Sequence, residues 1–306
     1  MSSLFKTIAV VGSGALGLYY GGRLVRAGNA VRFLARGDLA VLRERGIVVR
    51  APEGHFTLPD VTVAETPEAI GPVDLVVITL KATANDQLAR LLPPLLHAGT
   101  VVVNLQNGLG VDEAVAAVVG AERTVGGLCF VGVNRLAPGI VECKVPGQIV
   151  AGEFVGAAQA RTRELAALFG RAGVDMQLSD SLASARWHKL VWNVAFNGLT
   201  VVGGGITTAE VLATPALAAE VDALMREVQA IAAAHGVAIS DAFLVEQLAR
   251  TRPLGAYKPS TLLDFLAGKA LEVEPIWGEP LRRAQGLGVP APRLAALYAA
   301  LVRVGR

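Results

Sequence analysis

The chain has 306 residues, of which 53% are hydrophobic and 18% charged, and its formal net charge is +2. This length exceeds one ordinary hydrophobic core and predicts two domains, while the apolar composition excludes a disordered chain. The small net charge and the scattered lysines and arginines argue against a nucleic-acid partner.

Neither a metal site nor a disulfide framework is expected. Cys129 and Cys143 are far apart and belong to no CxxC pair. The first residues, MSSLFKTIAVVGSG, do not resemble a secretory signal because glycines interrupt the apolar run at once. Apolar stretches elsewhere are too short to span a membrane. We therefore expect a cytoplasmic protein with reduced cysteines and no membrane partner.

The first half of the chain predicts a mostly parallel sheet. Residues 7–37 have the pattern of a strand, a glycine turn, a helix and a second strand. The apolar runs at 73–82 and 100–108 are typical of strands buried on both faces, and a helical segment at 85–96 separates them. Residues 46–64 and 124–152 contain short β-rich runs divided by PEG, APG and VPG turns, which predict antiparallel hairpins at the edge or end of the sheet.

The second half predicts helices almost throughout. An amphipathic helix is expected at 161–173, and the domain boundary is expected within 174–181, dividing the chain into 1–176 and 177–306. The expected fold class is α/β, with an N-terminal Rossmann-type sheet and a C-terminal all-helical domain. The helices of the second domain are expected over residues 182–202, 208–235, 242–251, 260–266, 271–286 and 293–304.

A glycine motif follows the first predicted strand and opens the first predicted helix. In the pattern GxGxxG, Gly12 permits a tight turn, Gly14 lets a pyrophosphate approach the backbone, and Gly17 lets the helix pack closely on the strand. This position in a βαβ unit predicts a dinucleotide site. Its residues are Gly12, Ser13, Gly14, Ala15, Leu16 and Gly17.

The residue after the second strand indicates which dinucleotide binds. An acid there would bind the ribose 2′-hydroxyl of NAD, whereas a basic group suits the 2′-phosphate of NADP. Arg36 stands at this point, with Asp38 two residues further on. We therefore expect NADP, although Asp38 leaves an approach to the ribose open.

Polar residues interrupt the apolar pattern of residues 187–197, WHKLVWNVAFN, at intervals of four. Lys189, Asn193 and Asn197 would share one face of a helix. A solvated face would carry charges, whereas one ammonium and two amides suit the binding of a carboxylate, carbonyl or hydroxyl. Lys81 and Asn107 follow two further strands, at the sheet edge where ligands bind in open α/β folds.

These segments together resemble the ketopantoate reductase (2-dehydropantoate 2-reductase) family over essentially the whole chain. The matching pieces are VGSGALG, LKA, QNGLG, WHKLVWNVAFN and KPSTLLDFLAGKALEVEPIWG, in that order. The resemblance implies an NADP-dependent oxidoreductase acting on CH–OH donors. It implies that NADPH reduces a small 2-oxo acid, namely 2-dehydropantoate to pantoate, in pantothenate and coenzyme A biosynthesis.

The resemblance also implies roles for individual residues. Lys189 would donate the proton, and Glu272 would help to orient it. Asn107 and Glu272 would flank the nicotinamide and the substrate. Lys81 and Arg36 would contact the cofactor. The groups that would hold the hydroxylated 2-oxo acid are Asn193, Asn197 and Ser260.

Two of these positions also fit ordinary structural roles, and part of the motif departs from the family. Ser260 is compatible with a helix cap, and Glu272 with a solvated acid on a helix. The family commonly has an E-I-D run where this chain has EVE followed by Pro275, and Trp277 adds bulk to the same helix. If Pro275 lies in a first turn, it shifts the start of the helix and the aim of Glu272.

Two other functions remain open from the sequence. A β-hydroxyacid dehydrogenase of the hydroxyisobutyrate type also has a nucleotide domain and a Lys-x-x-x-Asn helix, but it does not require Ser260 with Glu272. An NADP-sensing module without turnover would have no reason to keep Lys189 together with these two residues. The sequence is compatible with both a monomer and a homodimer.

Overall fold

The computed structural model describes residues 4–305, and the chain divides into two units. The first unit holds residues up to 106 and residues 111–182, and the second holds residues 107–110 and everything from residue 183. The expected boundary between residues 176 and 177 falls inside strand β10 (Met176–Leu178), which pairs with β9 (Ile140–Glu153). The chain thus leaves the sheet later than expected, and residues 107–110 belong with the helical unit.

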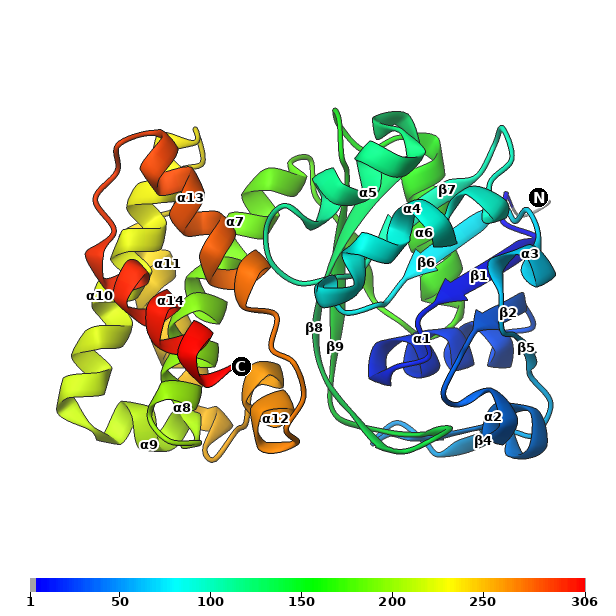
Figure 1. Cartoon of the computed structure of the whole chain (residues 1–306), viewed down its shortest axis with the longest axis horizontal. Helices are drawn as coiled ribbons and strands as arrows, with labels where there is room; N and C mark the ends of the chain where they lie inside the picture. The colour runs from blue at the N-terminus through cyan, green and yellow to red at the C-terminus, as the bar shows by residue number, and fades with distance from the viewer. Residues whose placement is uncertain (1–3, 306) are drawn as a thin grey trace. The chain divides into compact units, whose positions relative to one another are not determined.

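The first unit is built on one mostly parallel sheet, as the sequence predicts (Figure 1). The strand order is β4-β3-β9-β8-β7-β6-β1-β2-β5, and β10 pairs with β9. The remaining strands are β1 (Thr7–Val11), β2 (Ala30–Leu34), β3 (Ile47–Arg50), β4 (Phe56–Leu58), β5 (Thr62–Ala64), β6 (Leu75–Ile78), β7 (Val101–Asn104) and β8 (Thr124–Ala137).

The hairpin prediction is right for two pairs of strands and wrong for one strand. β8 and β9 form a long antiparallel hairpin, and β3 pairs with β4 in the same way. The β8–β9 hairpin lies inside the sheet instead of at its edge, and the predicted VPG turn lies within β9. β5 instead pairs in parallel with β2 at the opposite edge of the sheet, where Arg32 aligns with Thr62. The turn after β4 therefore separates two strands that the sequence pattern groups together.

Both faces of the central strands are covered, which explains their continuous apolar runs. Ile8 and Val10 of β1 lie in a core cluster with residues of α1 (Ala15–Arg26) and α6 (Ala160–Arg171). Ala9 and Val11 lie in a second cluster with residues of the helices on the other face. The other helices of this unit are α2 (Leu39–Arg45), α3 (Pro67–Ile70), η1 (Ala82–Gln87), α4 (Leu88–Leu91), η2 (Pro93–Leu95), α5 (Val111–Val119) and η3 (Ala121–Arg123).

The second unit is helical over the residues that the structure describes, as expected. Its core combines two buried tryptophans with leucine, valine and methionine side chains from most of its helices. These helices are α7 (Leu182–Trp192), η4 (Asn193–Asn197), α8 (Gly198–Val202), α9 (Thr208–Ala213), α10 (Pro215–Ala234), α11 (Asp241–Thr251), η5 (Arg252–Leu254), α12 (Ser260–Leu266), η6 (Glu274–Gly278), α13 (Glu279–Gly286) and α14 (Pro292–Val304).

Three of the expected helices differ in detail. The helix expected over residues 208–235 breaks at Thr214, because Pro215 lacks an N–H and occupies the first turn of a new helix. The helix expected over 182–202 is continuous but contains the π-helical turn η4. The helix expected over 271–286 begins at Val273 and opens with a second π-helical turn, η6.

The start of β1 is fixed by one carboxylate from the loop before β6. Asp74 accepts hydrogen bonds from the backbone N–H groups of Lys6 and Thr7, both at 2.9 Å, and from the Thr7 hydroxyl at 3.0 Å. Burial raises the pKa of the Asp74 carboxyl, but the hydrogen bonds from Thr7 and Lys6 favour the carboxylate more strongly. The pKa of Asp74 therefore lies below its ordinary value of 3.8.

We expect Asp74→Ala to lower the free energy of unfolding, and we expect this loss to depend on pH. Because the pKa of Asp74 is depressed in the folded state, its stabilising contribution is present above 3.8 and disappears as the pH falls through the folded-state value. Urea unfolding at a series of pH values should therefore show the gap between wild type and variant closing in acid. The exposed Asp60, replaced by alanine, is the control. A gap that stays constant across this range would contradict the assignment.

Candidate functional site

The glycine turn between β1 and α1 has two glycines that the fold requires and one that faces open space. Gly12 has φ +113°, and a Cβ on Gly17 would lie 1.9 Å from the Gly12 carbonyl oxygen. The same carbonyl accepts a hydrogen bond from the Thr79 hydroxyl at 2.7 Å. A Cβ on Gly14, in contrast, would meet nothing within 4 Å. The turn thus packs tightly against the protein except at Gly14.

The N-terminus of α1 has the properties of an anion site. Gly14 is the residue before the helix and provides no side-chain cap, and no acidic residue occupies the first turn. The first backbone N–H groups of a helix lack intrahelical partners and carry partial positive charge. These groups, beside the open face of Gly14, fit the pyrophosphate of a dinucleotide, which would lie on the Gly12–Gly17 turn.

The acid after β2 is engaged by an arginine of the same unit. Asp38 is buried and forms an ion pair with Arg135 of β8. Arg36, also beyond the end of β2, is exposed. The arrangement leaves a cation at the position that discriminates between the two dinucleotides, and it neutralises the acid that would favour NAD.

Buried amides that the sequence prediction missed hold the ends of β6 and β7 together. Gln106 donates from Nε2 to the Leu80 carbonyl at 3.1 Å and to Asn85 Oδ1 at 2.7 Å. Asn104 donates to Asp112 Oδ1 at 2.9 Å. Lys81, predicted to contact the cofactor, is exposed and directly precedes η1. The sequence signal for Asn104 and Gln106 is their polar side chains near the end of the otherwise apolar run at 100–108.

In the second unit, Lys189 and Asn107 come together although 82 residues separate them. The Lys189 ammonium donates a hydrogen bond to Asn107 Oδ1 at 2.8 Å. The segment 107–110 is held on η6, because Leu109 N–H donates to the Pro275 carbonyl at 2.8 Å. Gly108 has φ +93°, and a Cβ there would lie 2.4 Å from the same carbonyl oxygen. Only glycine permits this approach without strain.

The two predicted asparagines lie at the ends of the turn η4 and are buried. Asn193 is 8% exposed and Asn197 is 2% exposed. Asn197 Oδ1 accepts a hydrogen bond from Thr261 N–H at 3.2 Å, and this bond fixes the start of α12 beside Ser260. Ser260 is exposed and is the first residue of α12, after Pro259 at the cap position. The interpretation of Ser260 as the helix cap is therefore wrong.

Glu272 is buried, with 7% of its surface exposed, and it precedes the helix instead of lying on it. The interpretation of Glu272 as a solvated helix acid is therefore wrong. Pro275 lies in the first turn of the helix that begins at Val273, as the departure from the family motif suggested. A buried carboxylate needs a hydrogen-bond donor or a cation, which suits the predicted role beside an ammonium.

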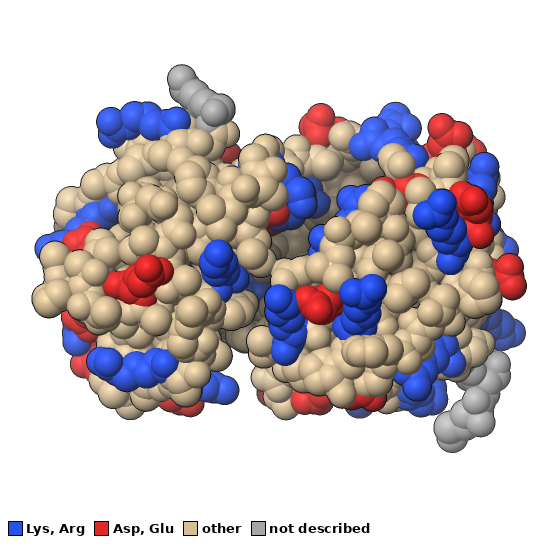
Figure 2. All heavy atoms as spheres, turned by 90° about the horizontal axis from the view of Figure 1, so that it is seen from below, with Lys and Arg blue, Asp and Glu red and all other residues tan. Residues whose placement is uncertain are grey.

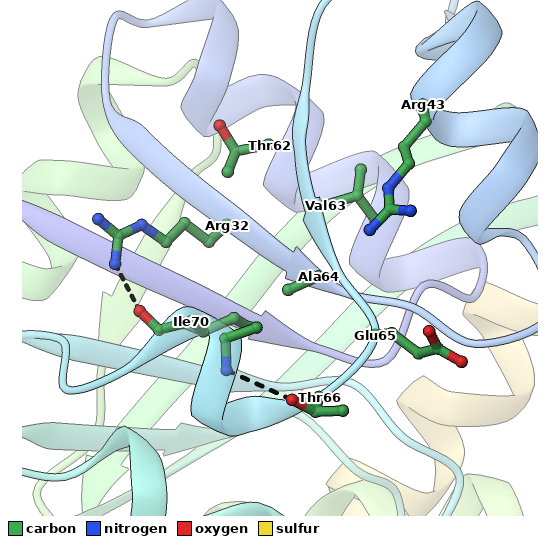
Figure 3. Close-up of a pocket in the computed structure, with 9 residues that line it drawn as sticks. Arg32, Arg43, Thr62, Val63, Ala64, Glu65, Thr66 and Ile70 are labelled. Carbon is green, nitrogen blue, oxygen red and sulfur yellow. Dashed lines mark hydrogen bonds between the residues drawn. The ribbon is translucent and has the colours of Figure 1, made fainter.

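The described surface also has a pocket away from the predicted site residues. A pocket beside the edge strand β5 (Figure 3) has two polar groups already in use: Arg32 donates to the Ile70 carbonyl at 2.6 Å, and Thr66 accepts from Ala69 N–H. None of the predicted site residues lines this pocket. Acidic and basic side chains are interspersed over the face seen in Figure 2.

Residues 4–305 contain no group of three or more His, Cys, Asp or Glu side chains arranged to hold a metal ion. The same residues form no helix with the length and apolarity to cross a membrane.

A mostly parallel Rossmann-type unit with a helical unit that presents a lysine and asparagines is the architecture of a nicotinamide-dependent oxidoreductase. Two family models match the chain: "Ketopantoate reductase PanE/ApbA" over residues 8–156 and "Ketopantoate reductase PanE/ApbA C terminal" over residues 181–304. The chain belongs to the ketopantoate reductase family, whose members are oxidoreductases acting on CH–OH donors.

Individual relatives support the same assignment over nearly the full length. A 2-dehydropantoate 2-reductase from a Nostoc species is 37% identical over 299 residues, covering 96% of this chain and 93% of that protein. One from Halobacterium salinarum is 30% identical, covering 98% of each. The crystal structure of a 2-dehydropantoate 2-reductase from Geobacter metallireducens superposes with a TM-score of 0.94 at 42% identity, covering 97% of this chain and 99% of that one.

We expect alanine at Gly17 to lower the stability of the protein and alanine at Gly14 to weaken the binding of the cofactor. Gly17→Ala places a Cβ inside contact distance of the Gly12 carbonyl, so it should lower the free energy of unfolding by about 1–3 kcal/mol or more. Gly14→Ala has open space and a φ of −81°, so the free protein should be unaffected. The added methyl should nevertheless weaken NADPH binding by roughly tenfold or more, which corresponds to about 1.4 kcal/mol.

Thermal unfolding without cofactor and titration of NADPH fluorescence separate the two effects. Unchanged NADPH affinity in Gly14→Ala would show that the pyrophosphate does not lie on this turn.

Proposed function

We propose that the protein catalyses the NADPH-dependent reduction of a 2-oxo acid, with 2-dehydropantoate as substrate and pantoate as product, in the cytoplasmic synthesis of pantothenate and coenzyme A. The observation that carries the proposal is the hydrogen bond from the Lys189 ammonium to Asn107 Oδ1. Names of relatives with 30% identity or more support the substrate.

The chemistry of this proposal needs one hydride and one proton. When bound, the reduced nicotinamide supplies the hydride to C2 of the 2-oxo acid. Lys189 donates a proton from Nζ to the carbonyl oxygen, so that the C=O bond becomes a CH–OH group. Asn107 accepts from the same ammonium and thereby orients it. Lysine then recovers its proton from solvent.

The remaining site residues would bind and orient. The amides of Asn193 and Asn197 and the Ser260 hydroxyl provide neutral donors and acceptors for the carboxylate and hydroxyl of the substrate. Glu272 would help to orient Lys189. Arg36 would bind the 2′-phosphate, and Lys81 the phosphate or nicotinamide side of the cofactor.

Replacing Lys189 should abolish most turnover and leave cofactor binding nearly intact. General acid assistance typically contributes about 10²–10⁴ in rate, so Lys189→Ala should lower kcat by that factor. NADPH affinity should change little, because the glycine turn belongs to the other unit. The loss of NADPH absorbance with 2-dehydropantoate and a panel of other 2-oxo acids measures turnover. The exposed Lys269, replaced by alanine, is the control. Normal turnover by Lys189→Ala would reject the mechanism.

The cofactor preference should depend on Arg36. Loss of a charge-assisted hydrogen bond costs about 1.5–3 kcal/mol, so Arg36→Ala should raise the KM for NADPH roughly 10- to 100-fold. The KM for NADH should stay within about twofold, because NADH lacks the 2′-phosphate. Arg45→Ala, at another exposed arginine of the same unit, should change neither value. Equal effects on both cofactors would mean that Arg36 does not read the 2′-phosphate.

Assays of the panel of 2-oxo acids with NADPH, and of 3-hydroxy acids with NADP, distinguish this proposal from the two other functions. A 3-hydroxy acid oxidised with NADP would indicate the hydroxyisobutyrate type of dehydrogenase. Binding of NADPH without turnover of any hydroxy or oxo acid would indicate a sensing module. The presence of Ser260 together with Glu272 favours the reductase, because the hydroxyisobutyrate type does not require these two residues.

A further inference from the structure

Two π-helical turns of the second unit are joined by one buried hydrogen bond. The indole N–H of Trp277, in η6, donates to the Val194 carbonyl, in η4, at 2.9 Å. Trp277 and Val194 are both completely buried. The two residues are 83 positions apart in the chain. This bond therefore ties together two segments that nothing in the local sequence connects.

The turn η6 also anchors the segment that carries Asn107, the hydrogen-bond partner of Lys189. The Pro275 carbonyl accepts from Leu109 N–H at 2.8 Å, which anchors the segment that carries Asn107. Trp277 lies two residues further along the same turn. The turn η6 thus contacts the backbone near both partners of the Lys189–Asn107 hydrogen bond. It contacts the helix that follows Lys189 and the loop that contains Asn107.

The width of η4 decides where its asparagines point. In a regular α-helix each step of four residues turns by about 400°, so positions 189, 193 and 197 drift about 40° per step around the axis. A π-helical turn closes its hydrogen bonds over five residues and rotates less per residue, so the step from Asn193 to Asn197 turns by less than in an α-helix. The step from Lys189 to Asn193 lies in the α-helix before this turn and keeps its ordinary rotation. Such turns are rare and irregular, and a side-chain donor that enters the backbone ladder can stabilise one.

The ends of both turns are closely packed. A Cβ on Gly198, directly after η4, would lie 2.7 Å from Leu297. A Cβ on Gly278, the last residue of η6, would lie 2.5 Å from the Glu274 carboxylate. That carboxylate is itself held by the Tyr298 hydroxyl at 2.6 Å and by Arg282 at 2.7 Å. Close packing therefore bounds the C-terminal end of each π-helical turn.

We propose that Trp277 is a positioning residue for the reduction, and that its indole N–H keeps η4 in the wide turn that sets the direction of Asn197 relative to Lys189 and Asn193. The inference rests on the proposed function for its effect on turnover. Trp277 does not act on the substrate itself. Its bond to the Val194 carbonyl holds the backbone that carries Asn197, whose amide also accepts from Thr261 N–H, and Pro275 of the same turn anchors the loop of Asn107.

Two replacements at position 277 separate the hydrogen bond from the volume of the ring. Trp277→Phe removes the N–H and part of the ring. Incorporation of 3-benzothienylalanine at position 277 keeps the bicyclic shape and puts sulfur in place of the N–H. Both should lower kcat/KM for the 2-oxo acid by about tenfold, the effect of one buried hydrogen bond, with NADPH affinity within about twofold of wild type.

Trp192→Phe is the matched control. It also removes one indole hydrogen bond, to Thr251 Oγ1 at 2.8 Å, but this bond joins α7 to α11 and involves no backbone group of either π-helical turn. Phenylalanine also keeps an aromatic ring beside Phe196, on which the Trp192 ring stacks. The control should change thermal stability by a similar amount and leave kcat/KM unchanged. Equal activity losses in the two variants, or full activity with benzothienylalanine, would overturn the proposal.

Hydrogen exchange gives a readout that does not require turnover. Backbone N–H groups of residues 193–199 should exchange faster in both position-277 variants than in wild type, and unchanged exchange there would refute the inference. A wild-type protein that turned over no 2-oxo acid would reject the proposed function. In that case this exchange experiment would still decide whether the indole maintains the turn.

Discussion

The hydrogen bond between the Lys189 ammonium and Asn107 Oδ1 is the constraint around which the second unit is organised. A half-buried ammonium is costly unless an acceptor replaces the water that it loses. The acceptor comes from residues 107–110, a short segment that leaves the sheet of the first unit and belongs with the helices. This segment is held through its backbone, by Leu109 on Pro275 and by the close approach of Gly108, so the amide of Asn107 is left to meet the lysine.

The first unit separates the residues that build the turn from those that can meet a ligand. Gly12 and Gly17 are required because the Thr79 region and the turn itself occupy the space that side chains would need. Gly14 has no such neighbour, so neither packing nor backbone conformation requires glycine at this position. The charged residues at the end of β2 divide in a similar way: Asp38 forms an ion pair with Arg135 inside the protein, whereas Arg36 is exposed.

The sequence predicted the sheet, the helical second half and the polar residues, because those depend on short-range periodicity and turn chemistry. It did not predict which polar residues meet, since Lys189 and Asn107 are 82 residues apart. It missed both π-helical turns, because each is a single turn, too short for hydrophobic periodicity to distinguish it from the α-helix around it. It grouped β5 with β4, whereas β5 pairs with β2. Tertiary contacts, which the local sequence does not reveal, decide which edge of the sheet a short strand joins. The contacts of Gln106 and Asn104 were missed for the same reason.

The irregular turns explain why a few polar residues suffice for a site in so apolar a unit. Lys189, Asn193 and Asn197 stand among buried valine, phenylalanine and tryptophan side chains, which cannot hold an amide in a particular direction. Direction comes from hydrogen bonds: Asn197 Oδ1 accepts from Thr261 N–H, and the Lys189 ammonium donates to Asn107 Oδ1. The backbone of η4 is held in addition through two carbonyls, Val194 by Trp277 and Phe196 by the Thr200 hydroxyl at 2.8 Å. Each such donor satisfies a buried acceptor that would otherwise cost free energy. The backbone that carries these polar groups is therefore held by Trp277 and Thr200, two residues outside the predicted site.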